Sequence, residues 1–256
     1  MKNNGLFLFA ELVRRNLSSR FAGTYGGRWW AVLNPLLLCA LYAFVFAVVL
    51  RLSPPAGFPG TYGEFLLAGL LPWLGLQDAV TRAATSITDS AHLVRKLPFP
   101  AELLVGSSVV AGLILQAAGV ALLVLYEAAV RRIVPNVPLL LLAFAFELLL
   151  LAGPALALAA VNVFFRDLSQ LLPPVLTITL YVTPIFYDES LVPGPMRQAL
   201  VLNPVRDLVG LFRFATAGGA PPDWTRVLAW SAAGAAAAVL GARFFRRSRP
   251  VFSDLL

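Results

Sequence analysis

The chain has 256 residues, of which 59% are hydrophobic and 13% are charged, and its net charge is +7. Soluble domains average about 45–50% apolar and about 25% charged residues, so this composition excludes an ordinary soluble protein. The basic excess does not lie in a polar domain that could form a groove for DNA or RNA. We therefore expect a membrane protein with no nucleic-acid partner.

Residues 1–28 precede the first long apolar segment, and their apolar positions recur at helical spacing. The apolar stripe comprises Leu6, Phe9, Ala10, Val13, Leu17 and Phe21, and it is opposed by Glu11, Arg14, Arg15, Ser18 and Ser19. This pattern predicts an amphipathic helix in the membrane interface, with Glu11 and Arg15 spaced for an i,i+4 ion pair. Such a helix either anchors the chain or gates a pathway, and composition does not separate the two.

The rest of the chain contains long apolar segments. A helix rises about 1.5 Å per residue and the hydrocarbon core is about 30 Å thick, so each crossing needs roughly 20 apolar residues. Six segments qualify: 30–50, 62–85, 102–126, 138–164, 168–187 and 224–245. The sequence thus predicts an all-α, polytopic membrane protein with six transmembrane helices in a single transmembrane domain spanning 1–256, with spans 1–5 within 29–187.

The segments outside the spans give the orientation. Of the 20 lysine and arginine residues, thirteen lie on the side of the two termini and seven lie on the opposite side. The positive-inside rule therefore predicts cytoplasmic termini, with 246–256 as a cytoplasmic tail, in a multi-pass protein of the cytoplasmic (inner) membrane. Residues 188–223, between the fifth and sixth spans, are long and mixed in composition, which predicts short ordered helices at the outer surface.

Several kinds of catalytic chemistry are missing from the sequence. Its two lysines, Lys2 and Lys96, do not follow a glycine-rich phosphate-binding loop, so we expect no ATP hydrolysis by this chain. The single histidine, His92, excludes sites that need two histidines, and no nucleophile is spaced to meet it. We predict no catalytic residue, metal ligand or cofactor, and interpret His92 as a solvated or partner-facing residue.

Polar and aromatic residues inside the spans are candidates for function. Asp78 is spaced to pair with Arg82, whereas Glu147 has no such neighbour and is either a proton relay or an interhelical hydrogen-bonding group. Aromatic residues either stack on sugar rings in a pathway or lie in the ordinary belt at the membrane interface. The aromatic candidates are Trp29, Trp30, Tyr42, Phe44, Trp73, Tyr181, Phe186 and Tyr187, and Trp30 shares a helix face with Leu37 and Phe44.

Five short motifs, in order along the chain, resemble the permease subunits of type-2 ABC exporters of bacterial polysaccharides such as O-antigen or teichoic acid. They are GGRWWAVLNP at 26–35, HLVRKLPFP at 92–100, NVFFRD at 162–167, TPIFY at 183–187, and LNP at 202–204 with Arg213 downstream. Each motif is short, but together they cover nearly the whole chain in register. The first span departs from many members, since Leu37, Leu38 and Cys39 stand where rings are expected.

The resemblance implies a homodimer joined to two separate nucleotide-binding ATPase subunits, with a lipid-linked glycan passing between the halves and membrane lipid as a further partner. It assigns a loop that couples to the ATPase, containing Asp89, His92, Leu93, Arg95 and Lys96. It assigns a substrate entrance at Arg14, Arg15, Arg20 and Trp30, where guanidinium groups would meet a diphosphate. The polar and aromatic residues of the spans predict a pathway lining of Asn34, Tyr42, Phe44, Trp73, Tyr181 and Phe186, and the resemblance implies an outer gate at 188–223.

Other functions stay open on the sequence. A small-lipid or drug exporter of the same class would need fewer aromatic residues in its pathway. A proton-coupled carrier would use Glu147. A membrane enzyme is the third class, and the chain lacks the acid, base and nucleophile that such an enzyme needs.

Overall fold

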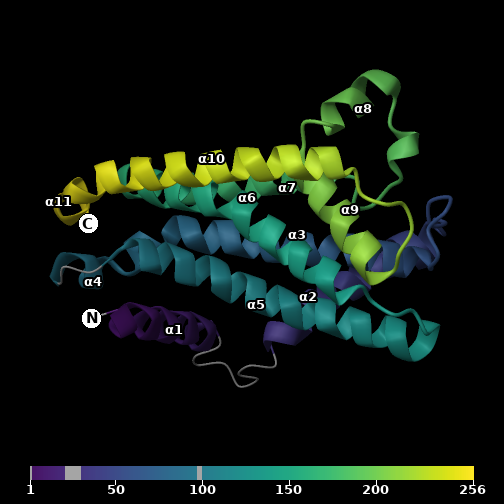
Figure 1. The fold of residues 1–256 in the computed structure, drawn as a ribbon, viewed down its shortest axis with the longest axis horizontal. Helices are drawn as coiled ribbons and strands as arrows, with labels where there is room; N and C mark the ends of the chain where they lie inside the picture. The colour runs from purple at the N-terminus through teal and green to yellow at the C-terminus, as the bar shows by residue number, and fades with distance from the viewer. Residues whose placement is uncertain (1, 21–29, 97–99) are drawn as a thin grey trace.

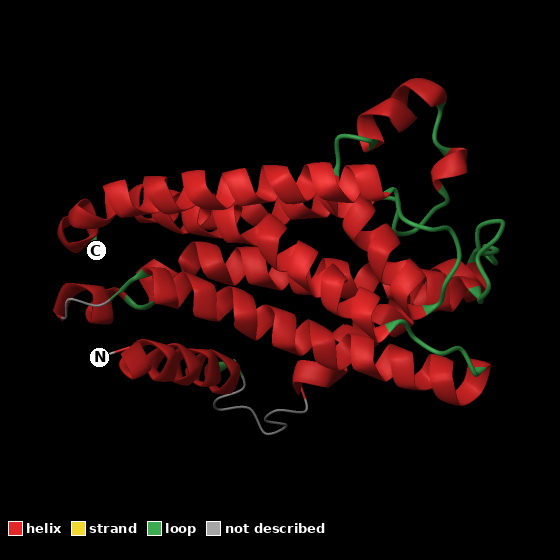
Figure 2. Ribbon diagram, viewed as in Figure 1, coloured by secondary structure: helices red, strands yellow, loops and turns green. Residues whose placement is uncertain are grey.

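The computed structural model of the chain describes residues 2–20, 30–96 and 100–256. Within these ranges every regular element is a helix, as the composition predicts (Figure 2). The longest helices are α3 (Tyr62–Asp89), α5 (Glu102–Tyr126), α6 (Val137–Phe164) and α10 (Trp224–Ser248), which run along the long axis of the molecule (Figure 1). Helix α3 is central, because it packs against α5, α6 and the shorter α9 (Pro204–Thr216).

The helices begin where the sequence supplies capping groups. The Thr61 hydroxyl accepts a hydrogen bond from the amide of Glu64, and the Glu64 carboxylate accepts one from the amide of Thr61, which makes a capping box for α3. Asn136 accepts from the amide of Leu139 at the start of α6, and Asp223 caps α10. The first amides of these helices therefore have partners without help from another element.

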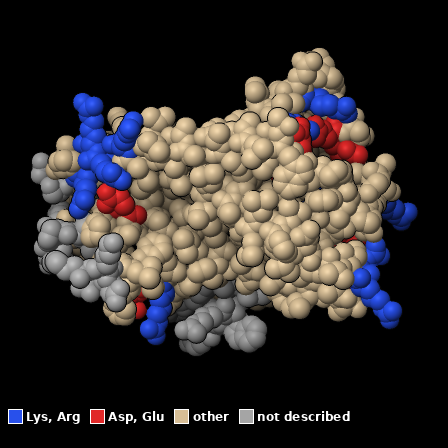
Figure 3. Space-filling view, viewed as in Figure 1, with Lys and Arg blue, Asp and Glu red and all other residues tan. Residues whose placement is uncertain are grey.

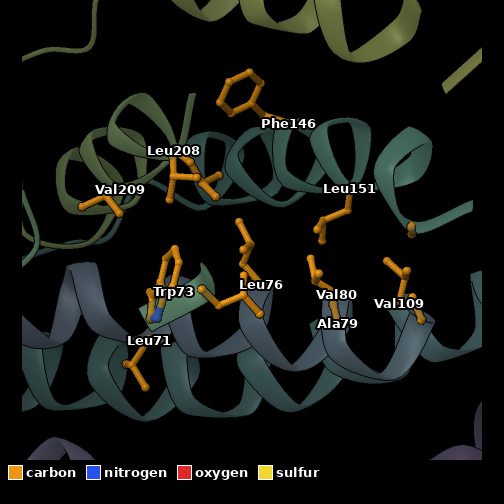
Figure 4. Close-up of a cluster of buried hydrophobic side chains, with 14 of the residues drawn as sticks. Leu71, Trp73, Leu76, Ala79, Val80, Val109, Phe146, Leu151, Leu208 and Val209 are labelled. Atoms are coloured by element: carbon orange, nitrogen blue, oxygen red, sulfur yellow. The ribbon is translucent and has the colours of Figure 1, made fainter. Parts of the chain in front are cut away.

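Apolar side chains from four helices meet in the middle of the bundle. Trp73 and Leu76 of α3 lie there with Val109 of α5, Leu151 of α6 and Leu208 of α9 (Figure 4). Trp73 has no exposed surface, and its indole N–H donates to the side-chain oxygen of Gln77. The prediction that Trp73 lines a pathway is therefore corrected: its ring is part of the core of one chain.

The charged side chains gather at the two ends of the molecule, with a broad band free of them on the face drawn in Figure 3. Among the described residues, the continuous helices Glu102–Arg131, Val137–Phe164 and Trp224–Val251 are long and apolar enough to cross a membrane. Leu36–Val49 and Leu168–Val182 are shorter apolar helices, and α3 carries four charged residues along its 28-residue length. The multi-pass membrane architecture is clear, and the count of six spans stays a prediction.

Helices α6 and α10 approach so closely that their backbones touch. A Cβ on Gly153 would overlap the carbonyl group of Ala237 and come within 2.7 Å of the Ala238 nitrogen. A Cβ on Gly241 would lie 2.9 Å from the Gly153 Cα. Small residues are the usual means by which membrane helices pack in close contact. This pair of helices is therefore held by glycine positions rather than by large side chains.

The N-terminal helix α1 (Lys2–Ser19) is present as predicted, but it packs along α5. Leu12 and Val13 are buried, whereas Leu6, a member of the predicted stripe, is 76% exposed. Phe21 lies outside the described residues. The face of α1 that packs is thus rotated from the stripe predicted by spacing: it includes Leu12, which lies outside the stripe, while Leu6 and Ala10 of the stripe are exposed.

The first and fifth apolar helices leave broad faces uncovered. Helix α2 (Trp30–Ala43) continues as the π-helix η2 (Phe44–Val49), and Trp30, Leu37 and Phe44, predicted to share one face, are all exposed. Helix α7 (Leu168–Val182) exposes Val175, Ile178 and Tyr181 among others. These faces are apolar and contact nothing else among the described parts of the chain that would bury them.

Two helix ends differ from the sequence prediction. Helix α7 ends at Val182, before the predicted limit at Tyr187, and the Tyr187 hydroxyl donates to the carbonyls of Tyr181 and Val182 at that end. Helix α10 runs to Ser248 and is followed by η5 (Arg249–Val251) and α11 (Phe252–Leu255). Phe252 is fully buried against the ring of Phe245, so the predicted tail is a packed helical segment.

Residues 188–223, called the outer segment after their predicted side of the membrane, contain short helices, as predicted. They are η4 (Glu189–Leu191), α8 (Gly194–Leu200) and α9, which lie at the end of the bundle opposite the two termini (Figure 1). Asn203 caps α9 through the amide of Val205 and donates to the hydroxyl of Thr183. The LNP motif therefore fastens the start of α9 to the end of α7.

Candidate functional site

A polar cavity of about 270 Å³ lies between the C-terminal end of α1 and the helices α3 and α5. Helix α1 is positioned there by the Phe9 ring, which lies against Gly106 of α5. The side-chain amide of Asn16 donates to the hydroxyl of Ser107 at 2.9 Å, which fixes the rotation of α1. The cavity is lined by Arg15, Asn16, Ser19, Arg20, Arg82, Thr85, Ser86, Asp89, Ser90, Leu104 and Ser108.

Arg20 is the central cation of this inner cavity. Its Nη1 donates to the Asp78 carboxylate at 2.6 Å, and Arg82 Nε donates to the other oxygen of Asp78 at 2.7 Å. The Arg20 side chain is 3% exposed, yet its Nε and Nη2 groups have no acceptor among the described residues. Burial lowers the pKa of Arg20, and the adjacent Asp78 partly opposes that shift.

A buried guanidinium with two nitrogens that lack an acceptor is suited to an oxyanion. Arginine presents its donors in a planar fork that matches phosphate, and hydrogen bonds to charged groups are the strongest of their kind. The serine and threonine hydroxyls around the cavity add further donors. The site can therefore bind a phosphate-sized anion by hydrogen bonds and charge, without a metal or a nucleophile.

The inner cavity adjoins the segment that the sequence assigned to ATPase coupling. Helix α4 (Ala91–Lys96) follows α3 after Ser90, and both Asp89 and Ser90 line the cavity. Arg15 Nη2 donates to the Ser90 hydroxyl at 3.3 Å. Helix α1 therefore contacts the residue at which α3 passes into α4, so a displacement of α4 would be felt at the cavity.

The predicted coupling residues occupy α4 and the end of α3. Asp89 is the last residue of α3, His92 is exposed, and Leu93 packs against the core. The side chains of Arg95 and Lys96 lie outside those that the structure describes, as do residues 97–99 of the same motif. On its other side α4 contacts α11, so two short helices share this end of the molecule (Figure 1).

The predicted entrance residues do not all come together. Arg15 and Arg20 line the inner cavity, whereas Arg14 is 81% exposed and lies 3.9 Å from Glu11. The expected pair of Glu11 with Arg15 is thus replaced by a pair with Arg14, because Arg15 turns toward Ser90. Trp30 is exposed and does not line the cavity.

Sequence reasoning missed several residues of the inner cavity. Arg82 was assigned to a pair with Asp78, which the structure confirms, but its place beside Arg20 was not predicted. Ser86, Ser90 and Ser108 were not singled out at all. Their signal was the recurrence of hydroxyl residues at the ends of α3 and α5 nearest the basic residues, in spans that are otherwise apolar.

The predicted pathway residues divide into exposed and buried groups. Phe44 and Tyr181 are 56% and 54% exposed, and Tyr42 is half-buried. Phe186 is 3% exposed beneath the rings of Tyr42 and Phe46, at centroid distances of 5.1 and 5.0 Å. Phe186 therefore packs beneath the rings of Tyr42 and Phe46 and is not exposed to a pathway, which corrects its prediction as a lining residue. The side chain of Asn34 lies outside the described ones.

Glu147 has an interhelical partner. Its Oε2 accepts a hydrogen bond from the amide of Gln116 on α5 at 2.6 Å, and its side chain is fully buried. Its Oε1 has no partner within the described ranges. Glu147 was predicted to be either a proton relay or an interhelical hydrogen-bonding group, and the interhelical hydrogen bond is present between α5 and α6.

The outer segment is held to the bundle by Arg213 of α9. This guanidinium donates to the backbone carbonyls of Phe65, Pro184 and Ile185 and lies 3.5 Å from the centre of the Phe65 ring. Burial lowers the pKa of Arg213 to about 9. Arg213, noted in the sequence as part of the LNP motif, therefore connects α9 with α3 and with the segment after α7.

A polytopic helical bundle with a basic cavity and a short helix at the same end has the parts of a membrane permease, the transporter subunit through which a solute passes. The sequence pattern of the family described as ABC-2 type transporter matches residues 8–215. The chain belongs to this family. Its membership implies a separate ATPase subunit as partner, and a permease role that is not itself catalytic.

Three related proteins are similar in sequence to most of this chain. The chain is 30% identical to the O-antigen export system permease protein RfbA of Myxococcus xanthus, over 96% of this chain and 94% of that protein. Two proteins of the same name from Klebsiella pneumoniae are 26% and 27% identical, each over 82% of this chain and 81% of their own length. The resemblance identified from five motifs is confirmed at the level of the family.

Proposed function

We propose that this permease exports a lipid-linked polysaccharide of the O-antigen type across the cytoplasmic membrane, with energy supplied by the partner ATPase. The observation that carries the proposal is the similarity, over 96% of the chain, to a permease named for O-antigen export. Both termini are cytoplasmic in this proposal, since they lie at the same end of the bundle as α4 (Figure 1). The opposite end, with α8 and α9, faces outward.

The inner cavity is the proposed substrate entrance. A glycan linked to a lipid through phosphate presents an oxyanion at the membrane surface, the place where the inner cavity would lie. Arg20 offers the two nitrogens that lack an acceptor, and Arg15 and Arg82 add charge. Arg14 is left out of the proposed entrance because its side chain points to solvent. The hydrogen bond from Arg15 to Ser90 gives a route by which α4 could alter the cavity.

The proposed pathway lies between two copies of the chain. The exposed faces of α2 and α7 supply apolar and aromatic surface, including Phe44 and Tyr181. Exposed apolar area of this extent is stable in lipid or against a partner, and sugar rings stack on aromatic faces. We propose that these faces meet those of a second copy and that α4 docks on the ATPase.

The proposal is tested by reconstituting the chain with its partner ATPase in proteoliposomes. We expect no ATP hydrolysis by the chain alone, hydrolysis by the complex, and ATP-dependent movement of the lipid-linked glycan. Arg20→Gln should reduce glycan movement at least about tenfold, because it removes the charged fork from the inner cavity. Arg246→Gln, which removes an exposed charge from the last turn of α10, is the matched control and should leave movement unchanged.

Two results would contradict the proposal. Hydrolysis of ATP by the chain alone would show that the energy source is the permease itself and not the partner ATPase. Equal loss of transport in Arg20→Gln and Arg246→Gln would show that net charge at this end, rather than the inner cavity, governs uptake. A small-lipid exporter of the same family is the alternative, and transport of phospholipid without any glycan would favour it.

A further inference from the structure

A second and larger cavity, of about 540 Å³, opens at the outer end of the molecule, far from the inner cavity. Its walls come from the loop before α3, the segment after α7, the polar side of α9 and the link into α10. Of the residues that the sequence analysis singled out, Tyr187 and Arg213 line it, and much of the rest of its wall belongs to the predicted outer gate at 188–223. Cavities of about 300–1,000 Å³ are the usual size for binding small molecules.

One face of α9 forms the floor of this outer cavity. Arg206, Gly210 and Arg213 follow one another at helical spacing and all three line the cavity, while Leu208 and Phe212 on the other side are buried in the core. A Cβ on Gly210 would meet nothing within 4 Å. The middle of the floor is therefore open space above a glycine.

The charges around the outer cavity nearly cancel. Asp188, Glu189, Asp207 and Asp223 supply four carboxylates, and Arg206, Arg213 and Arg226 supply three guanidinium groups, for a formal net charge of −1 (3 − 4). Arg206 Nε donates to Glu189 at 2.7 Å, and Arg226 Nη2 donates to Asp207 at 2.6 Å. A site so balanced favours neither a phosphate nor a cation.

Paired side chains still leave hydrogen-bonding capacity for a neutral ligand. Each carboxylate oxygen has more than one acceptor direction, and a guanidinium has five N–H groups. The side chains of Arg206 and Glu189 are 18% and 27% exposed, and that of Arg226 is 21% exposed, so each pair keeps accessible surface. The cavity thus presents fixed donors and acceptors of both kinds, which matches the alternating demands of sugar hydroxyl groups.

Aromatic rings complete the wall. Phe58 and Tyr187 are half-buried and line the cavity. The Tyr187 ring is held by its two hydrogen bonds to the end of α7, so its face is presented in a fixed orientation. Aromatic faces bind the C–H surface of a sugar ring, while the surrounding charges exclude an acyl chain from the same space.

We propose that the outer cavity is a binding site for neutral sugar units of the exported glycan, on the outer side of the membrane. The inference rests on the proposed export function and adds to it a site that is separate from the entrance and the pathway. Binding there would hold a segment of glycan that has already crossed and so oppose its slipping back.

The test fills the cavity from its floor. Gly210→Leu places a side chain into the open space without a clash at Cβ, and it replaces glycine in a helix interior by a better helix former. Gly194→Leu is the matched control, because Gly194 on α8 also has nothing within 4 Å of its Cβ and does not line the cavity. Thermal unfolding of both variants establishes that they fold.

Binding is measured by saturation-transfer NMR on the purified permease–ATPase complex in lipid nanodiscs. The probes are methyl glycosides of neutral hexoses and 6-deoxyhexoses, with inorganic phosphate and ethylammonium as charged comparators. We expect at least one neutral glycoside to bind the wild type and Gly194→Leu, with its Kd raised at least about tenfold in Gly210→Leu. Neither charged probe should compete.

Three results would overturn the site: no glycoside binds the wild type, Gly210→Leu binds as the wild type does, or a charged probe displaces the glycosides. ATP hydrolysis by the same complexes separates this failure from failure of the proposed function. A complex that hydrolyses ATP and moves glycan but binds no glycoside refutes the outer site alone. A complex that binds glycoside yet moves none refutes the export proposal.

Discussion

Replacing Gly153 by alanine probes the closest helix contact in the molecule. The added Cβ would lie 2.7 Å from the Ala238 nitrogen and overlap the carbonyl group of Ala237. Since non-bonded heavy atoms are comfortable at about 3.5 Å, relieving the Ala238 contact alone needs a separation of about 0.8 Å, and the closer Ala237 carbonyl requires α6 and α10 to move further apart. The glycine contact runs along the helices to Gly234 and Gly241, so the separation would loosen it over several turns.

The expected loss of stability combines two effects. Overpacking of a tight contact costs about 1–3 kcal/mol, and the better helix propensity of alanine returns up to about 1 kcal/mol. A net loss of about 1–2 kcal/mol corresponds to a fall in apparent Tm of roughly 2–8 °C for a chain of this length. The assay is thermal unfolding of the purified protein in detergent, followed by tryptophan fluorescence at one fixed heating rate.

The control is Gly210→Ala, which adds the same methyl group where nothing lies within 4 Å. Its apparent Tm should equal or exceed that of the wild type, because only the propensity gain applies. A Gly153→Ala protein as stable as the wild type would refute the reasoning. So would an equal loss in the two variants, since that would assign the effect to alanine itself rather than to the contact with α10.

Three further substitutions address other parts of the chain. Glu147→Gln keeps a hydrogen-bonding partner for Gln116, so ATP-driven transport in proteoliposomes should stay within about twofold of wild type. Abolished transport with an intact ATPase complex would favour a proton-coupled carrier. Arg213→Met leaves three backbone carbonyls without their donor and should lower the free energy of unfolding by about 3 kcal/mol. Arg213→Lys should lose less stability. An unchanged Tm would contradict the bridging role of Arg213. Phe252→Ala should cost about 3 kcal/mol, because a fully buried ring is removed, and equal stability would show that α11 is not held by it.

The sequence predicted the positions of the apolar helices well because length and hydropathy govern membrane insertion. It predicted their packed faces poorly. In lipid, a helix is apolar on the side toward the membrane as well as on the side toward the protein, so α6 has almost no amphipathic pattern that would mark its contact with α10. The faces are chosen by small residues, such as Gly153 and Gly241, whose role becomes evident only when the backbones are placed.

In the candidate sites too, contacts within one helix were predictable from the sequence and contacts between distant segments were not. The pair of Asp78 with Arg82 followed from spacing within one helix, and the structure confirms it. The contact of Asp78 with Arg20 joins positions 58 residues apart and has no signal in a single sequence. Trp73 was selected because aromatic side chains suit sugars, but the same ring also fills a core, and composition does not say which helix face it occupies.

The packing of α11 against α4 has a practical consequence for work on this protein. Both termini and α4 lie at one end of the bundle, and Leu256 directly follows the short helix that touches α4 (Figure 1). An affinity tag or fluorescent protein fused after Leu256 would therefore emerge beside the surface proposed to receive the ATPase. Labels intended to leave assembly undisturbed belong instead in the loop around α8, which projects from the opposite end.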